Sequence, residues 1–368
     1  MANAVTKKQD NVITLEVQKN NLPVEEVVLG PYEVVLGDVM QSTIDDYDAF
    51  DARAWNKGDG YKSGFPIFDE KLEGLEEGLY VIGAESNVGK SAILTNLIWR
   101  YAMNEENHLF GIYFSLDDSR NELIPRLIAM NQQIPISVAS KPQRYQNMIE
   151  AGEPNSSQYV EMLQKRSAGI EQLKEARNRI KFVDSEIINC GEKLVDYCIK
   201  LQDYIRSFDP DANIIVGIDS LADIRWPSQN FRAGDENAVV SYTAKQIKSL
   251  AVDVLRCPIF GTYHLRKIDQ TKRPTIADMK SSGELIYEAS AIFLAHNDVG
   301  RNQQNASIYW TQENNAELQP VIEFHWAKNK KSTFKGRTYF DLFAGQSRIV
   351  EATTEEMQRY DSLIYSSR

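Results

Sequence analysis

The residues with the clearest chemistry are Gly89, Lys90 and Ser91, which close the stretch Ala84-Glu-Ser-Asn-Val-Gly-Lys-Ser91. This stretch has the spacing of a phosphate-binding P-loop, with alanine in place of the first glycine. In such a loop consecutive main-chain N–H groups point at phosphate oxygens, the lysine reaches the β- and γ-phosphates, and the serine hydroxyl binds Mg²⁺. The sequence therefore predicts a nucleoside triphosphate site that is formed by Ser86, Asn87, Val88, Gly89, Lys90 and Ser91.

The segments around this loop have the order that a P-loop needs. The apolar run Leu79–Ile82 precedes it as a strand, and Ala92–Trp99 follows with helical periodicity, which argues against a chance Gly-Lys-Ser turn. From Gly64 onward strands and helices alternate, which favours an α/β fold with a mostly parallel central sheet flanked by helices. The expected strands are Leu79–Ile82, Leu109–Ser115, Ile180–Val183, Ile214–Ile218, Pro258–Tyr263 and Ala291–Ala295, and the clearest helices are Glu192–Phe208 and Asn237–Leu255.

The two ends of the chain differ from this alternating pattern. The sequence pattern of residues 1–60 predicts an N-terminal tail and linker with one amphipathic helix over Asp38–Phe50. Residues 61–350 form the expected ATPase domain, which closes with a β-hairpin of Val321–Trp326 and Thr338–Phe343. Residues 351–368 predict a polar helical tail.

A second chemical position is Asp219, which follows the apolar run Ile214–Ile218. A P-loop ATPase needs a further carboxylate to orient Mg²⁺, usually at the end of a neighbouring buried strand. Asp219 fits this place, and Asp223 is the competing candidate. The alternative is an ordinary acidic residue at a strand end.

Hydrolysis also needs a group that orients or deprotonates water beside the γ-phosphate. Asp117 follows the expected strand Leu109–Ser115, but an aspartate before a helix is also a common N-cap. His264 follows the strand Pro258–Tyr263, where it either senses the γ-phosphate or makes a structural hydrogen bond. The residue types alone leave both roles open.

Composition limits the classes of function. A net charge of −11 and a pI near 5.1 argue against a protein that coats nucleic acid, although they allow a few local contacts. No segment has the apolar length of a membrane span, and the N-terminus lacks the apolar stretch of a secretory signal. Three cysteines without Cys-x-x-Cys spacing fit a reducing compartment, and the four histidines show no zinc spacing. We therefore expect a cytoplasmic protein without a membrane partner.

In their order along the chain, these motifs resemble the C-terminal ATPase domain of DnaB-type hexameric replicative helicases, which has a RecA-like fold. The run from Arg273 to Gly283, with Arg-Pro followed by Asp-Met-Lys-Ser-Ser-Gly, is the most specific of them. The matching segments are Gly64–Gly74, the P-loop, Phe114–Ser119, Ile218–Leu221, Arg273–Gly283 and Ala327–Lys330.

The resemblance implies roles for the remaining polar residues. It makes Asp117 the catalytic carboxylate, in place of the usual glutamate, and His264 the γ-phosphate sensor. It implies that Lys328 and Lys330 reach the nucleotide of a neighbouring subunit, where Lys330 replaces the usual arginine finger and Lys331 is the alternative. A shorter carboxylate and a lysine without the guanidinium fork predict slower hydrolysis.

The resemblance also implies two loops that bind DNA in a central pore. The second loop corresponds to Lys280, Ser281, Ser282 and Gly283, where small residues let a main-chain N–H approach a phosphate. The first follows Ser220, and there Arg225 and Arg232 are the expected phosphate contacts. Trp226 and Phe231 either stack on bases or pack against protein, and packing is the favoured interpretation.

The function that the resemblance implies is an ATP- and Mg²⁺-dependent helicase that moves 5′ to 3′ on single-stranded DNA during replication, as a homo-oligomeric ring, most often a hexamer. The short N-terminal region predicts a compact form of the phage or plasmid type, acting in a bacterial host with a primase or helicase loader on another chain. Two alternatives stay open. One is a recombinase-like or clock-like ring or filament that binds ATP without unwinding DNA, and the other is a non-enzymatic scaffold that loads or regulates a helicase.

Overall fold

The computed structural model of the chain describes residues 5–9, 12–16, 26–29, 47–48, 50–52, 54, 60–232, 234–269, 272–279, 283–311 and 317–366. The chain divides into two units, Met1–Gly60 and Tyr61–Arg368, and each is described by itself. Within the described ranges, no helix combines the length and the apolar character that crossing a membrane requires.

The first unit contains a small antiparallel sheet. In it β2 (Val12–Glu16) pairs with β1 (Val5–Gln9) on one side and with β3 (Glu26–Leu29) on the other. The sequence predicted only a tail and linker here, because each apolar run is too short to distinguish a strand from a loop. The expected helix over 38–50 lies mostly outside the described residues, of which 47, 48 and 50 are helical, so it stays a prediction.

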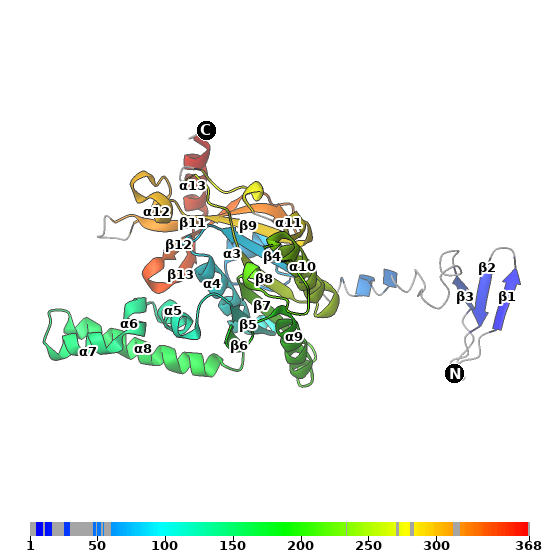
Figure 1. The fold of residues 1–368 in the computed structure, drawn as a ribbon, viewed down its shortest axis with the longest axis horizontal. Coiled ribbons are helices and arrows are strands. Elements are labelled where there is room, and N and C mark those ends of the chain that lie inside the picture. The colour runs from blue at the N-terminus through cyan, green and yellow to red at the C-terminus, as the bar shows by residue number, and fades with distance from the viewer. Residues whose placement is uncertain are drawn as a thin grey trace. The chain divides into compact units, whose positions relative to one another are not determined.

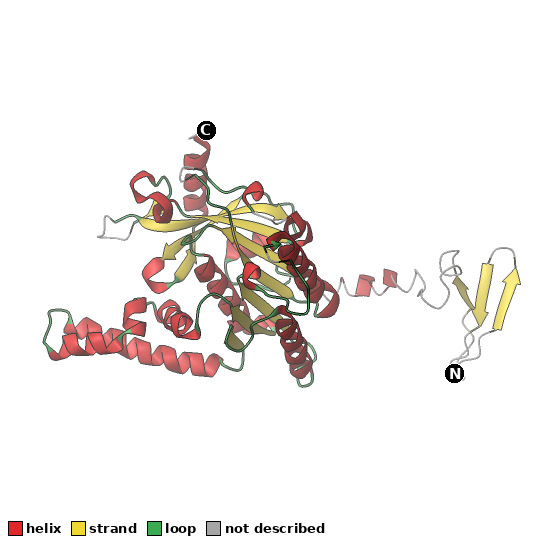
Figure 2. Cartoon of the chain, viewed as in Figure 1, coloured by secondary structure: helices red, strands yellow, loops and turns green. Residues whose placement is uncertain are grey.

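The second unit is built on one ten-stranded sheet (Figures 1 and 2). Its strand order is β13-β12-β11-β9-β4-β8-β7-β5-β6, with β10 paired to β11. The pairings from β9 through β4, β8, β7 and β5 to β6 are parallel, and those that β11, β12 and β13 make are antiparallel. The strands are β4 (Gly78–Ala84), β5 (Leu109–Ser115), β6 (Ile180–Asp184), β7 (Asn213–Asp219), β8 (Pro258–His264), β9 (Ala291–His296), β10 (Tyr309–Trp310), β11 (Gln319–Asn329), β12 (Arg337–Phe343) and β13 (Arg348–Glu351).

Helices cover both faces of this sheet (Figure 2), because its central strands are apolar on both sides. Every residue of β4 is buried, and successive side chains point to opposite faces. Tyr80 and Ile82 join one core cluster, which α4 (Lys90–Met103) completes. Leu79 and Val81 join another, together with α9 (Gly191–Arg206) and α10 (Glu236–Ser249). The six expected strands, the hairpin and the α/β class are confirmed.

The remaining helices lie at the edges of this arrangement. Between β5 and β6 the chain makes four helices, and α7 and α8 run side by side away from the sheet (Figure 1). The last helix buries Met357, Tyr360 and Ile364 against Val321 and Tyr339, so the C-terminal segment packs onto the sheet. These helices are α3 (Pro66–Leu72), α5 (Arg120–Gln132), α6 (Ile136–Ser140), α7 (Pro142–Glu150), α8 (Ser156–Ala176), α11 (Gly283–Glu288), α12 (Asp298–Asn302) and α13 (Thr354–Ser366).

The short helix α3 is anchored to the sheet by Phe68, whose side chain is fully buried. Its ring centroid lies 5.3 Å from that of Trp326, 5.7 Å from Phe293 and 6.3 Å from Phe340. Aromatic groups that pack in this way contribute large apolar areas to a core.

We expect Phe68→Ala to lower the free energy of unfolding by about 3–5 kcal/mol, because it leaves a cavity among these rings. The matched control is Phe208→Ala, since that side chain is 59% exposed, and its cost should stay below about 1 kcal/mol. Chemical denaturation of both variants measures the difference. Equal costs would show that the aromatic cluster does not anchor α3.

Candidate nucleotide-binding and catalytic site

The predicted P-loop forms the connection between β4 and α4. Gly89 has φ +113°, a conformation that favours glycine, and a Cβ at this position would lie within a tight 3.2 Å of Ile322 Cδ1. Asn87 is also left-handed, with φ 64°, a conformation that asparagine tolerates better than most residues. The side chain of Val88 is buried in the core and anchors the loop there.

The amino end of α4 is suited to bind an anion. Gly89 is its N-cap residue and provides no side-chain cap, so the first N–H groups of the helix keep no side-chain partner at this position. Lys90 Nζ donates a hydrogen bond to the carbonyl oxygen of Glu85 at 2.8 Å. Burial lowers the pKa of Lys90, and the carboxylates of Asp219, Asp117 and Glu85 oppose that shift. A lysine in an uncapped helix amino end fits a polyphosphate group.

Asp219 ends β7 and is held in a fixed orientation. Its carboxylate accepts hydrogen bonds from Tyr113 Oη at 2.9 Å and Thr262 Oγ1 at 2.5 Å, and its side chain is buried. Burial raises the pKa of Tyr113 well above its ordinary value, so the hydroxyl stays protonated and donates. The competing candidate, Asp223, accepts instead from Ser220 Oγ at 2.5 Å and lines a different cavity.

Asp117 follows β5 but does not cap the next helix. Ser119 is the N-cap residue of α5, and it forms a capping box with Glu122. The neighbouring Asp118 is ion-paired with Arg126. Among the described residues, Asp117 has no such structural partner, and it is exposed. The N-cap alternative is therefore wrong for this residue.

Strand register brings these groups to one edge of the sheet. Ser115 pairs with Asp219 across β5 and β7, and Ala84 pairs with His264 across β4 and β8. A cavity of about 520 Å³ opens there. Its lining includes the predicted residues Ser86, Asn87, Gly89, Lys90, Ser91, Asp117, Asp219 and His264.

The oxygen donors at this cavity fit Mg²⁺ with a nucleotide. The Ser91 hydroxyl and the Asp219 carboxylate are hard oxygen ligands, which Mg²⁺ prefers. Within the described ranges, no three His, Cys, Asp or Glu side chains cluster to hold a metal ion.

Residues 60–335 match the family profile described as the DnaB-like helicase C terminal domain. This chain belongs to the DnaB-like helicase C-terminal domain family. The match covers the P-loop and the strands β4 to β11, so Lys90, Asp117, Asp219 and His264 all lie within the matched region.

Individual relatives agree with this assignment. The chain is 23% identical over 301 residues to the replicative DNA helicase DnaB of Buchnera aphidicola subsp. Acyrthosiphon pisum (strain APS), which covers 78% of this chain and 57% of that protein. It is 25% identical over 274 residues to the DnaB of Haemophilus influenzae (strain ATCC 51907 / DSM 11121 / KW20 / Rd), which covers 73% of this chain and 53% of that protein. The chain thus spans little more than half the length of both relatives.

Solved structures show the same fold. A solved ATPase domain superposes with a TM-score of 0.67 at 20% identity, and the match covers 85% of this chain and all of that domain. A DnaB-like replicative helicase, solved with regard to its interactions with primase, gives a TM-score of 0.62 at 19% identity over 85% of this chain and 68% of that one. The expected RecA-like fold of DnaB-type helicases is confirmed.

Lys328 and Lys330 do not join the P-loop cavity of their own DnaB-like domain. Lys328 lies beside Ile292 of β9, and the N–H of Lys330 donates to the carbonyl oxygen of Ser290, just before that strand. Both side chains donate to the carbonyl oxygen of Tyr287, at 2.8 and 3.1 Å. They therefore lie at the amino end of the parallel strands, and the seven residues of β4 separate this edge from the P-loop by about 20 Å. The alternative, Lys331, is ion-paired with Glu76.

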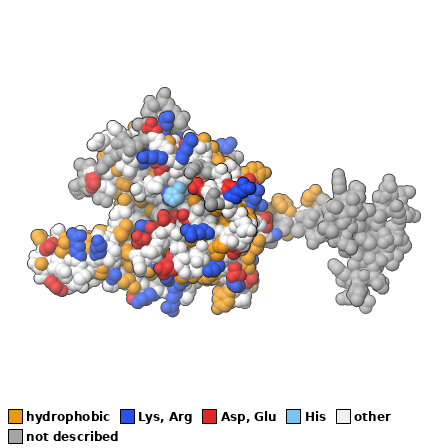
Figure 3. Space-filling model, viewed as in Figure 1, with side chains coloured by type: hydrophobic (Ala, Val, Ile, Leu, Met, Phe, Trp, Pro, Cys, Tyr) orange, Lys and Arg blue, Asp and Glu red, His pale blue; other side chains and the backbone are white. Residues whose placement is uncertain are grey.

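The DNA-binding candidates are placed only in part. Gly283 begins α11, whereas Lys280, Ser281 and Ser282 lie outside the described residues. Arg225 and Arg232 are exposed. Trp226 is buried and donates to Thr243 Oγ1 at 2.8 Å, so the packing interpretation holds for this residue. Figure 3 shows acidic and basic side chains interspersed on the visible face of the domain.

The sequence did not predict a role for several residues that lie at the site. Tyr113 and Thr262 orient Asp219, yet in the sequence they are ordinary strand residues. Glu85 is paired with Arg301, which lies 216 positions away in the chain. The one available signal was strand periodicity, because Thr262 stands two positions before His264 on a strand already expected to end at the site.

The pKa of Lys328 offers a test of the geometry at the opposite edge. Burial and, after it, the positive charge of Lys330 lower this pKa to about 8, so the amine is still mostly protonated at pH 7. We expect Lys330→Met to raise the pKa of Lys328, because it removes the like charge. The measurement is the pH dependence of Nζ acetylation, read by mass spectrometry. Lys331→Met is the matched control and should leave the labelling midpoint of Lys328 in place. A midpoint that is the same in the wild type and in Lys330→Met would contradict the contact between the two lysines.

Proposed function

We propose that this chain is an ATP-dependent helicase that moves on single-stranded DNA during replication. The observation that carries the proposal is the convergence of Lys90, Ser91, Asp117, Asp219 and His264 on one cavity at the carboxyl edge of the sheet. Membership of the DnaB-like family and relatives that are named replicative DNA helicases support the same activity.

Each residue at the cavity has a separate task in this proposal. ATP, when bound, supplies the γ-phosphoryl group that is transferred to water. Lys90 and the N–H groups of α4 would balance phosphate charge, while Ser91 and Asp219 would hold Mg²⁺. Asp117 faces the cavity without a structural partner among the described residues, and it orients and deprotonates the attacking water. His264 contacts the γ-phosphate as its sensor. It also precedes the segment that leads to the candidate DNA loop at 280–283.

The proposal includes an assembly, because one chain does not complete the site. Lys328 and Lys330 lie at the opposite edge of the sheet, and a ring of identical subunits would bring such an edge against the P-loop of the next copy. We infer a hexameric ring with 5′ to 3′ movement in the cytoplasm of a bacterial host. The structure of one similar DnaB-like replicative helicase was described together with its interactions with primase. This supports a separate primase or loader as partner.

Two substitutions test the cavity. We expect Lys90→Ala to abolish nucleotide binding and turnover, because it removes the main positive charge of the P-loop. Asp117→Asn should keep nucleotide binding and lower the turnover rate by about 10²- to 10⁴-fold, which is the usual effect of losing a general base. Binding of a fluorescent ATP analogue and steady-state ATPase rates measure the two effects. Asp223→Asn is the matched control and should change neither by more than about threefold, because it lies outside the cavity. Turnover that persists in Lys90→Ala would refute the site.

Subunit mixing tests the role of the two lysines. Lys90→Ala and the double variant Lys328→Ala/Lys330→Ala should each be inactive alone. When they are mixed in equal amounts, about a quarter of the interfaces should join an intact P-loop to intact lysines, because head-to-tail rings assemble at random. ATPase activity should then recover to a measurable fraction of the wild type. A mixture that only averages its two components would show that the lysines act within their own subunit or not at all.

A further inference from the structure

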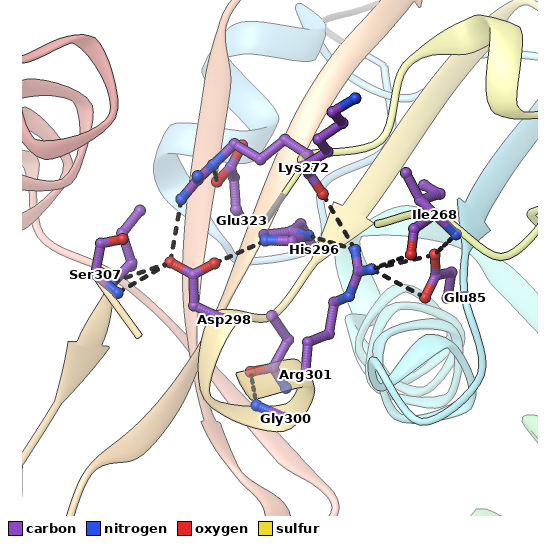
Figure 4. A network of polar contacts seen from close by, with 12 residues as sticks. Glu85, Ile268, Lys272, His296, Asp298, Gly300, Arg301, Ser307 and Glu323 are labelled. Atoms are coloured by element: carbon purple, nitrogen blue, oxygen red, sulfur yellow. Dashed lines mark hydrogen bonds and ion pairs between the residues drawn. The ribbon is translucent and has the colours of Figure 1, made fainter. Parts of the chain in front are cut away.

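The side chain of Arg301, on α12, connects two loops that are far apart in the sequence (Figure 4). This side chain is 8% exposed, and its Nη2 lies 3.3 Å from both carboxylate oxygens of Glu85. The same guanidinium donates to the carbonyl oxygens of Ile268 at 3.0 Å, Asp269 at 3.2 Å and Lys272 at 3.2 Å. One side chain thus holds both the P-loop and the segment that follows β8.

The main chain of Glu85 is part of the P-loop, and its side chain contacts the segment that follows β8. Its carbonyl oxygen accepts from Lys90 Nζ at 2.8 Å. Its carboxylate Oε1 accepts from the N–H of Ile268 at 2.5 Å, in addition to the pair with Arg301. The negative charge therefore lies beside the phosphate-binding loop and is neutralised from the side of the 265–279 segment.

The 265–279 segment connects the γ-phosphate candidate to the DNA candidate. It begins directly after His264, and the N–H of Leu265 donates to the carbonyl oxygen of Ala84 at the end of β4. An ion pair of 2.7 Å between Arg266 and Asp278 ties its two ends together. Its last residue, Met279, precedes the candidate loop at 280–283.

A second set of contacts holds the middle of this segment (Figure 4). Arg273 pairs with Asp298 at 3.2 Å and with Glu323 at 2.6 Å. Asp298 Oδ1 lies 2.7 Å from His296 Nε2, and His296 Nδ1 lies 3.5 Å from Arg301 Nη1. Because these groups are paired and partly or fully buried, the loss of one partner is costly, and the contacts hold Arg273 in a defined position.

From this geometry we propose that Arg301 is a positioning residue that couples the P-loop to the 265–279 segment through Glu85. The inference rests on the proposed function, because it concerns how nucleotide and single-stranded DNA affect each other. A change in the P-loop on nucleotide binding moves the Glu85 carboxylate, which accepts from both Arg301 and the N–H of Ile268. The segment then shifts its preference for DNA, and by thermodynamic reciprocity DNA shifts the affinity for nucleotide by the same factor.

The test measures the coupling factor itself. This factor is the ratio of the Kd values for a fluorescent oligo-dT strand without and with a non-hydrolysable ATP analogue, read by fluorescence anisotropy of the full chain. We expect Arg301→Gln to reduce the factor by about fivefold or more, towards one. Glu85→Gln should reduce it to a similar extent. The double variant should show no further loss, because the two residues form one link.

The control is Arg100→Gln, which removes another guanidinium that donates to main-chain carbonyl oxygens, in this case those of Ser63 at 3.0 Å and Gly64 at 2.6 Å, away from the 265–279 segment. It should lower thermal stability and keep the coupling factor. If Arg301→Gln does not fold, Glu85→Gln carries the test alone, since it keeps the shape of the side chain. Coupling that stays at the wild-type value in a folded Glu85→Gln or Arg301→Gln would overturn the inference, and so would additive losses in the double variant. Wild-type protein that shows no nucleotide effect on DNA binding would instead overturn the proposed function.

Discussion

The structure depends on the carboxyl ends of four parallel strands meeting at one edge of the sheet. β4, β8, β7 and β5 are adjacent and parallel, so whatever follows each of them is brought to the same place. The P-loop and Asp117 follow β4 and β5, and His264 and Asp219 are the last residues of β8 and β7. Because the strands are buried on both faces, their register is fixed by packing, and the site takes its geometry from the core rather than from a loop.

Burial of charge is the second constraint. Lys90 and Asp219 are both buried, and a buried charge is costly unless it is paired or hydrogen-bonded. Two hydroxyl groups satisfy Asp219, and the carbonyl oxygen of Glu85 accepts from Lys90. These contacts pre-orient the groups, so little rearrangement is needed when a charged ligand enters. An acidic protein can therefore present a local site for an anionic ligand, since the relevant field is that of nearby fixed groups and not that of the net charge.

The candidate functional groups lie at two opposite edges of the sheet. The carboxyl edge holds the P-loop cavity, and the amino edge holds Lys328 and Lys330 against the carbonyl oxygens that end α11. Antiparallel pairing of β11 with β9 accounts for this, because it returns the chain to the amino end of the parallel strands. A lysine pair at that edge lies too far from its own P-loop to serve it, and this separation supports the proposed assembly in which each copy completes the next.

The elements with strong local patterns could be predicted without the structure. The P-loop, the six core strands and the C-terminal hairpin follow from glycine spacing and apolar runs, and Asp219 and His264 follow from their places at strand ends. The sequence did not reveal the strands β1 to β3, whose apolar runs are short, or the packing of α13 onto the sheet. Whether Asp117 caps a helix or faces the cavity was also decided only in three dimensions, where Ser119 takes the cap. The same holds for Tyr113, Thr262 and Arg301, because a hydrogen bond between residues more than forty positions apart leaves no local pattern in the chain. Local patterns record what neighbours in sequence do, and only the folded sheet brings distant residues within bonding distance.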